Sequence, residues 1–174
     1  MNQRARGIGN EFLMSCDMRF ATTSPSVLLS QLETSLGANP GAGGAMYLSQ
    51  LMGRGRAFEY VLASKDIDAV TAERYGWINR AFATSSELKD YVQKLAARIA
   101  LFPPDAIVGV KQGINAVSRP PMGVIITDAQ DVINALAATP VAQQLLKKVI
   151  AATHNQSIGE LELNYGRDIE SLFE

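Results

Sequence analysis

One glycine-rich turn and two glutamates are the groups in this sequence best suited to chemistry. The turn is Gly7-Ile8-Gly9, and it leads into a segment that we expect to be helical from Asn10 onward. The first N–H groups of a helix have no intrahelical partner and carry partial positive charge, so backbone N–H groups near Ile8 are suited to face an oxyanion. A Gly-x-Gly sequence taken by itself is also compatible with a purely structural turn.

The two acids are Glu11 and Glu33. Glu11 falls in the first turn of the expected helix, where the helix dipole favours negative charge and the side chain can reach the mouth of the glycine turn. Glu33 lies within residues 31–37, a stretch otherwise without charge, where burial would raise its pKa and suit it to general acid or base catalysis. The alternatives are a dipole-stabilising surface acid at Glu11 and an exposed acid on a short helix at Glu33.

Other reactive groups are few. No Lys-Ser or Lys-Thr pair follows the second glycine cluster, residues 41–44, so we interpret that cluster as a helix-entry turn and not as a phosphate loop. The one cysteine, Cys16, is expected to be a small buried apolar side chain, and the one histidine, His154, a solvated residue. With so few sulfur and imidazole groups, we expect no metal site and no disulfide within the chain.

The composition is that of one globular domain. The chain has 174 residues, of which 47% are hydrophobic, and this is enough apolar material for a core. Its net charge of -1 offers no basic footprint for nucleic acid. No apolar run approaches the ~20 residues of a membrane-spanning helix, and the N-terminus shows no apolar signal segment. We therefore expect a cytoplasmic protein with neither a nucleic-acid nor a membrane partner.

The elements that must position the glycine turn and the acids are short in the front half of the chain. Hydrophobic spacing predicts a helix after Gly9 and further helices in 46–52, 56–63 and 69–75. Alternating or continuous apolar residues predict strands, and these segments are residues 17–22, 26–30 and 77–82.

From residue 86 onward the pattern is almost wholly helical. A helix behind a Ser86 cap ends at Pro103-Pro104, and further helices are expected to about residue 117 and over 124–138 and 141–152. The tail places apolar residues near heptad spacing, and they are Ile158, Leu161, Tyr165, Ile169 and Leu172. Because Gly159 and Gly166 weaken this segment as a helix, we expect it to need a partner surface.

Three sequence blocks together resemble the enoyl-CoA hydratase/isomerase (crotonase) family. They are residues 4–19 (RARGIGNEFLMSCDMR), 36–44 (LGANPGAGG) and 51–57 (LMGRGRA), in the order and approximate spacing of the family. The likeness extends through Trp77-Ile78-Asn79-Arg80 to about residue 117, beyond which only the helical character matches. The resemblance implies an α/β fold, part of a crotonase-like ββα spiral followed by a helical C-terminal region. Residues 1–117 would be the rear part of the core, and residues 118–174 would serve assembly.

The resemblance also assigns roles to the candidate groups. The Ile8 N–H, in the Gly7 to Gly9 turn, would be one of two backbone donors to the thioester carbonyl of an acyl-CoA. Glu11 and Glu33, 22 residues apart, would be the acid/base pair. Coenzyme A would enter as part of the substrate, with no separate cofactor. Because hydration uses two carboxylates and double-bond isomerisation can use one, we expect a hydratase-like lyase, with an isomerase as the alternative. The resemblance also implies a homo-oligomer, a trimer or a hexamer.

The sequence also departs from the family pattern. Ile8 stands where the family usually has glycine, Leu32 where a proline often precedes the second glutamate, and Asn39 where an apolar residue is usual. The family's first oxyanion donor lies ahead of the glycine turn, and only six residues precede that turn here, so we expect an N-terminal part of the domain to be lacking. The alternative function is therefore a non-catalytic, truncated crotonase-fold protein that serves as an assembly or interaction module. A helical module unrelated to coenzyme A is a third possibility.

Overall fold

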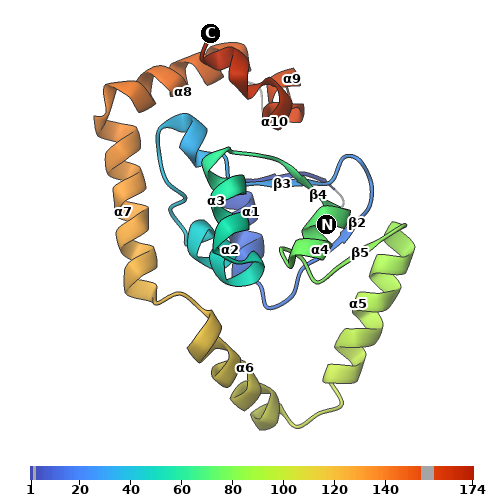
Figure 1. The fold of residues 1–174 in the computed structure, drawn as a ribbon. Coiled ribbons are helices and arrows are strands. Elements are labelled where there is room, and N and C mark those ends of the chain that lie inside the picture. The colour runs from blue at the N-terminus through green and yellow to red at the C-terminus, as the bar shows by residue number, and fades with distance from the viewer. Residues whose placement is uncertain (2, 154–158) are drawn as a thin grey trace.

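The computed structural model describes residues 1, 3–153 and 159–174 (Figure 1). The front half contains short strands and helices, which are β1 (Ala5–Arg6), α1 (Ile8–Ser15), β2 (Phe20–Thr22), β3 (Leu28–Ser30), the 3-10 helix η1 (Glu33–Leu36), α2 (Gly44–Met52), α3 (Arg54–Leu62), β4 (Ile67–Asp68), α4 (Ala69–Tyr75) and β5 (Arg80–Phe82). The rear half is helical and comprises α5 (Ser85–Ile99), α6 (Pro104–Ser118), α7 (Met122–Ala138), α8 (Pro140–Ala152), α9 (Glu160–Leu163), α10 (Tyr165–Asp168) and η2 (Ile169–Leu172).

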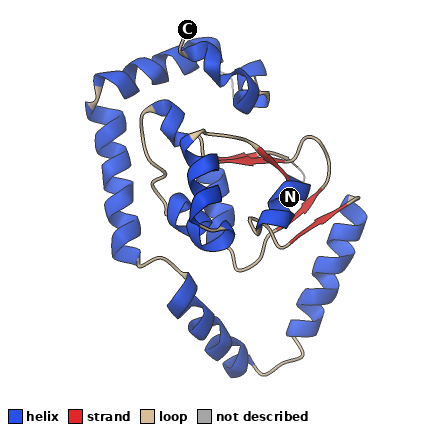
Figure 2. Cartoon of the chain, in the orientation of Figure 1, coloured by secondary structure: helices blue, strands red, loops and turns tan. Residues whose placement is uncertain are grey.

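The strands form two small sheets (Figure 2). β3 is the central strand of the first sheet, parallel to β1 and antiparallel to β4, and Leu29 faces Ala5 on one side and Ile67 on the other. In the second sheet β2 lies parallel to β5. A parallel pair needs a crossover, and α1 lies within the one that joins β1 to β3. The carboxyl end of β1 therefore delivers the chain directly into the glycine turn.

The core lies where these strands meet α2, α3 and α4. Its largest fully buried side chains include Trp77, Leu29, Leu48 and Ile67. The Trp77 ring meets that of Tyr60 edge-on, with centroids 5.9 Å apart. Its indole N–H donates to Asn10 Oδ1 at 3.0 Å, which satisfies a polar group that would be costly to bury alone. One hydrogen bond thus connects the core to the first turn of α1.

Helices α5 to α8 follow one another along an open arc outside this core (Figure 1). Neither α5 nor α6 has a buried residue. The arc is anchored at its start by an aromatic cluster, in which the Tyr91 ring of α5 lies 5.6 Å from Phe20 and 5.1 Å from Phe82, measured between centroids. These two phenylalanines come from β2 and β5, so α5 packs on the second sheet.

The starts of α1 and α5 show where the sequence expectations about helix caps were off. The expected start of the first helix at Asn10 is wrong, because the helix begins at Ile8 behind Gly7. Gly7 takes φ 53°, which favours glycine, and its carbonyl accepts from Asn10 and Glu11. Similarly Thr84, and not Ser86, caps α5 in a capping box with Glu87. The expected helices over 46–52 and 69–75 are confirmed, and the strands are shorter than expected.

The C-terminal tail returns to its own chain. Leu161, Tyr165, Ile169 and Leu172 form one buried cluster, against which Leu32 and Val149 pack. The partner surface expected for the heptad-spaced residues is thus supplied in part by this chain itself. Ile158, expected in the same stripe, and His154 lie outside the described residues. In the part of the chain that the structure describes, no helix combines the length and the apolar character needed to cross a bilayer.

Candidate active site

The glycine turn joins the first sheet to α1. The Gly7 N–H donates to the Ser30 carbonyl at 3.0 Å and so continues the pairing of β1 with β3 beyond Arg6. The Gly7 carbonyl accepts from the N–H groups of Asn10 and Glu11 at 2.9 and 3.0 Å. The N–H groups of Ile8 and Gly9 precede the first intrahelical bond and have no intrahelical acceptor. The Ile8 side chain is 74% exposed, so this end of α1 is open to the outside.

Glu11 is buried, with 3% of its surface exposed, and the interpretation as a surface acid is wrong. Its Oε1 atom accepts from the N–H groups of Ala42 and Gly44 at 2.7 and 2.9 Å. These donors belong to the second glycine cluster, which is a helix-entry turn, as expected, because α2 begins at Gly44. Both bonds use the same oxygen, so Oε2 of Glu11 remains for a further donor.

A chain of side-chain amides joins the core to the second acid. Asn10 accepts a hydrogen bond from the Trp77 indole N–H through Oδ1 and donates one through Nδ2 to Gln31 Oε1. Gln31 in turn donates through Nε2 to Glu33 Oε2 at 3.1 Å. Asn10 and Gln31 are fully buried. Neither residue was a predicted site residue, although each amide lies within two positions of a candidate acid, and that proximity was the available signal.

Glu33 is the first residue of η1 and is half-buried, which overturns the interpretation of an exposed acid. Its Oε1 lies 3.0 Å from the position that a Cβ on Gly7 would occupy, so the carboxyl faces the glycine turn. Burial, together with the charge of Glu11, raises the pKa of Glu33 from its usual value near 4.5 to about 7. The hydrogen bond from Gln31 acts in the opposite direction. The structure thus brings both predicted acids to the same turn.

Two hollows among the described residues do not contain the acid pair. One, of about 680 Å³, is bordered by Gly9 and by Arg4, Leu13 and Phe20. The other, of about 900 Å³, lies between the end of α1, α2 and α6, and Cys16 borders it. Proton transfer requires a catalytic group within hydrogen-bond distance of the substrate. We therefore identify the candidate site by the two acids and the glycine turn, and not by the volume of a hollow. Gly9 places the first hollow at the open end of the turn.

The remaining candidate groups take no part in this site. Cys16 is half-buried at the C-terminal end of α1, with Sγ 3.5 Å from the Phe12 carbonyl oxygen. Among the described residues, no group of three or more His, Cys, Asp or Glu side chains is placed to hold a metal ion.

Comparisons with known proteins point to one family. The family model for enoyl-CoA hydratase/isomerase matches residues 1–144, beyond the extent of about 117 residues expected from the motifs. A short-chain-enoyl-CoA hydratase of Clostridium acetobutylicum is 37% identical over 66% of this chain and 43% of its own, and one of Clostridioides difficile is 37% identical over 53% and 57%. A crystal structure of a "putative enoyl-CoA hydratase" from Streptomyces avermitilis superposes with a TM-score of 0.87 at 42% identity, over 97% of this chain and 60% of that one. The chain therefore spans about half the length of the relatives it matches.

The close approach at Gly44 gives a first prediction. An alanine Cβ at this position would lie 2.6 Å from Gln31 Nε2 and 3.0 Å from Glu11 Oε1, so we expect Gly44→Ala to lower the free energy of unfolding by about 1 to 3 kcal/mol. Gly55→Ala is the matched control, because a Cβ there meets nothing within 4 Å. This substitution should raise the free energy of unfolding by at most about 1 kcal/mol. Urea denaturation measures both. Equal effects of the two substitutions would contradict the packing described here.

The raised pKa of Glu33 gives a second prediction. The folded protein holds this proton more tightly than the unfolded chain, so its contribution to stability is present below pH 4.5 and is lost as the pH rises to about 7. At about 1.4 kcal/mol per pKa unit, the free energy of unfolding of wild type should fall by about 2 to 3 kcal/mol over this range. That of Glu33→Gln should not change for this reason, because its amide does not titrate. The difference is measured by denaturation at pH 5 and pH 8, with the exposed Glu59→Gln as the control for loss of a charge. A difference independent of pH would show that Glu33 is not desolvated.

Proposed function

Because the chain belongs to the enoyl-CoA hydratase/isomerase family, we propose that it acts in the hydration of enoyl-CoA thioesters, with Glu11 and Glu33 as the acid/base pair. One observation carries the proposal: two carboxyls from distant positions meet at the glycine turn, one facing Gly7 and the other fixed by the start of α2. Hydration of a conjugated double bond needs one group to take a proton from water and another to give a proton to the α-carbon.

The surroundings of the two carboxyls support different roles. With a pKa of about 7, Glu33 keeps its proton in about half of the molecules at neutral pH, which suits a general acid. Glu11 is held rigidly through Oε1, so its Oε2 is the atom available to accept a proton from water. In this scheme the water oxygen bonds to the β-carbon, Glu11 takes the water proton, and Glu33 gives its own proton to the α-carbon. The two carboxyls then exchange the proton to restore the starting state.

The glycine turn supports the charge that develops on the thioester oxygen. We propose the Ile8 N–H, in the turn from Gly7 to Gly9, as one donor, because it lies at the N-terminal end of α1 without an intrahelical acceptor. Loss of one such donor typically costs ~10²- to 10³-fold in rate. Coenzyme A would enter as part of the substrate, with no separate cofactor. The chain spans 43 to 60% of the relatives named above, so the proposal concerns the part of an acyl-CoA site that these residues build.

We also propose assembly as a homo-oligomer, a trimer or a hexamer. The helices of the outer arc expose large apolar side chains, among them Val110, Val117, Ile126 and Ile133. Large exposed apolar side chains are enriched at interaction surfaces, and a second copy of the chain is the partner that the family suggests.

An assay of crotonyl-CoA hydration, in which the loss of enoyl absorbance is monitored, tests the proposed activity. We expect Glu33→Gln and Glu11→Gln each to lower kcat by about 10² to 10⁴, because each removes one of the two proton-transfer groups. Glu59→Gln, an exposed acid paired with Lys65, should leave kcat unchanged. Turnover unaffected by Glu33→Gln would refute the assigned roles. The absence of both turnover and CoA binding in wild type would favour the non-catalytic alternative.

A further inference from the structure

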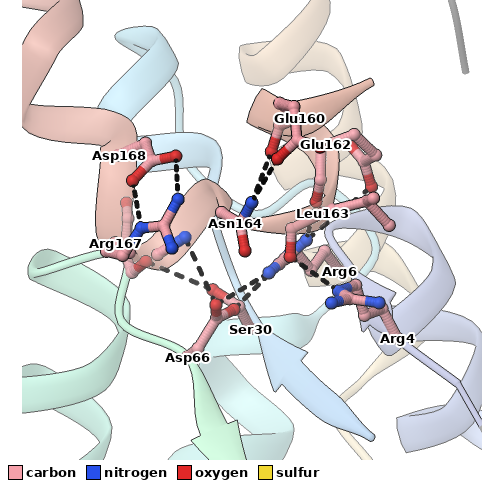
Figure 3. Close-up of polar contacts among 12 residues, drawn as sticks. Arg4, Arg6, Ser30, Asp66, Glu160, Glu162, Leu163, Asn164, Arg167 and Asp168 are labelled. Atoms are coloured by element: carbon pink, nitrogen blue, oxygen red, sulfur yellow. Dashed lines mark hydrogen bonds and ion pairs between the residues drawn. The ribbon is translucent and has the colours of Figure 1, made fainter. Parts of the chain in front are cut away.

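A buried ion pair lies directly beside the glycine turn. Arg6, the residue before Gly7, donates through Nε and Nη2 to the two carboxylate oxygens of Asp66 at 2.8 and 2.7 Å (Figure 3). The side chain of Arg6 is 3% exposed and that of Asp66 16%. A bidentate pair of this kind fixes the orientation of both side chains.

The same pair holds the C-terminal tail. Arg6 also donates through Nη1 to the Glu162 carbonyl, and Asp66 Oδ2 accepts from the Gly166 N–H at 3.2 Å (Figure 3). A neighbouring residue, Arg4, donates to the Leu163 carbonyl at 2.8 Å. A Cβ on Gly166 would overlap the Asp66 carboxylate, so this close approach requires glycine. The backbone of α9 and α10 is therefore tied to β1 from both sides of Tyr165.

Tyr165 connects the tail to the helical turn that carries Glu33. Its side chain is 3% exposed, and its hydroxyl lies 2.7 Å from Ser35 Oγ. The Ser35 hydroxyl already donates to the Leu32 carbonyl at 2.6 Å, so the proton between the two hydroxyls comes from Tyr165. Burial raises the pKa of Tyr165 and keeps it a donor, and the nearby charge of Glu33 acts in the same direction.

The turn of η1 is thus held between the tail and Gly7. Leu32 packs on the tail cluster, and its Cγ lies 3.8 Å from the position of a Cβ on Gly7. Ser64, after α3, donates to the Leu32 carbonyl at 3.3 Å and accepts from the Ser35 N–H at 3.1 Å, and α8 meets the end of η1 through an apolar contact of Ala142. The charged group that acts on Glu33 is Glu11, and those that act on Tyr165 are Glu162, Glu33 and Arg6.

We propose that Tyr165 is a positioning residue for Glu33: held by the Arg6–Asp66 pair through the backbone of α9 and α10, it bonds Ser35 and so fixes the Glu33 carboxyl opposite Gly7. The tail then forms one wall of the acid site. This inference rests on the proposed hydration for its consequence in turnover, but the positioning itself is a property of the protein without substrate.

Tyr165→Phe tests the proposal because it removes only the hydroxyl. In the protein without substrate, we expect the backbone amides of Ser35, Gly37 and Ala38 to exchange with solvent up to about tenfold faster, since the loss corresponds to one hydrogen bond. Exchange in α2 should not change. In crotonyl-CoA hydration, kcat should fall about tenfold with KM changed less than about twofold, and the decline of kcat above neutral pH should move to lower pH, because a less enclosed Glu33 loses its proton earlier.

Two further variants make the outcome decisive. Ser35→Ala should reproduce the changes of Tyr165→Phe, and the double variant should add little to either. Tyr60→Phe is the matched control, a buried tyrosine in the core, and should alter neither the exchange of these amides nor the pH profile. Unchanged exchange in Tyr165→Phe, or equal changes in Tyr60→Phe, would overturn the proposal. If wild type hydrates no crotonyl-CoA, the proposed function fails, and the exchange rates alone decide the positioning.

Discussion

The Glu11 carboxyl accepts two N–H groups at the start of α2, and the geometry of the acid site depends on this contact. It links α1 to α2 across the candidate site, at the point where the Gly44 backbone comes too close for any side chain. A buried carboxyl without such donors would be costly, so the second glycine cluster is needed as much as the acid itself. The same contact leaves Glu11 close enough to Glu33 for its charge to act on that carboxyl.

Around this contact, polar groups form two supports for Glu33, one from each side. The core side is neutral and runs from Trp77 through the amides of Asn10 and Gln31. The outer side is the tail, where a bidentate ion pair and backbone hydrogen bonds hold Tyr165 against η1. Buried polar groups specify a geometry when all of them are satisfied, and among the described residues no buried side-chain polar atom lacks a partner. The acid site is therefore a shared product of the two ends of the chain.

Local patterns in the sequence predicted the parts of this structure that local forces determine. The helices over 46–52 and 69–75 follow from apolar spacing and a stop at glycine, and the resemblance identified the family. The burial of Glu11 could not be predicted, because it depends on donors 31 and 33 positions away. The role of Gln31 had only the proximity of its amide to Glu33 as a signal, because its other partner, Asn10, lies 21 positions away. The packing of the C-terminal tail against β1 could not be predicted for the same reason. Nothing in the sequence around Arg6 and Asp66 indicates a contact with Gly166, which lies 100 residues beyond Asp66.

The central claim is that Glu11 and Glu33 form one electrostatically coupled site in which Glu33 keeps its proton near neutral pH. Titration of the Glu33 carboxyl by carbon-13 NMR, in wild type and in Glu11→Gln, measures this directly. We predict a midpoint at a pH of about 7 in wild type and a lower midpoint once the Glu11 charge is removed. A wild-type midpoint near 4.5, or a midpoint that does not move in Glu11→Gln, would contradict it.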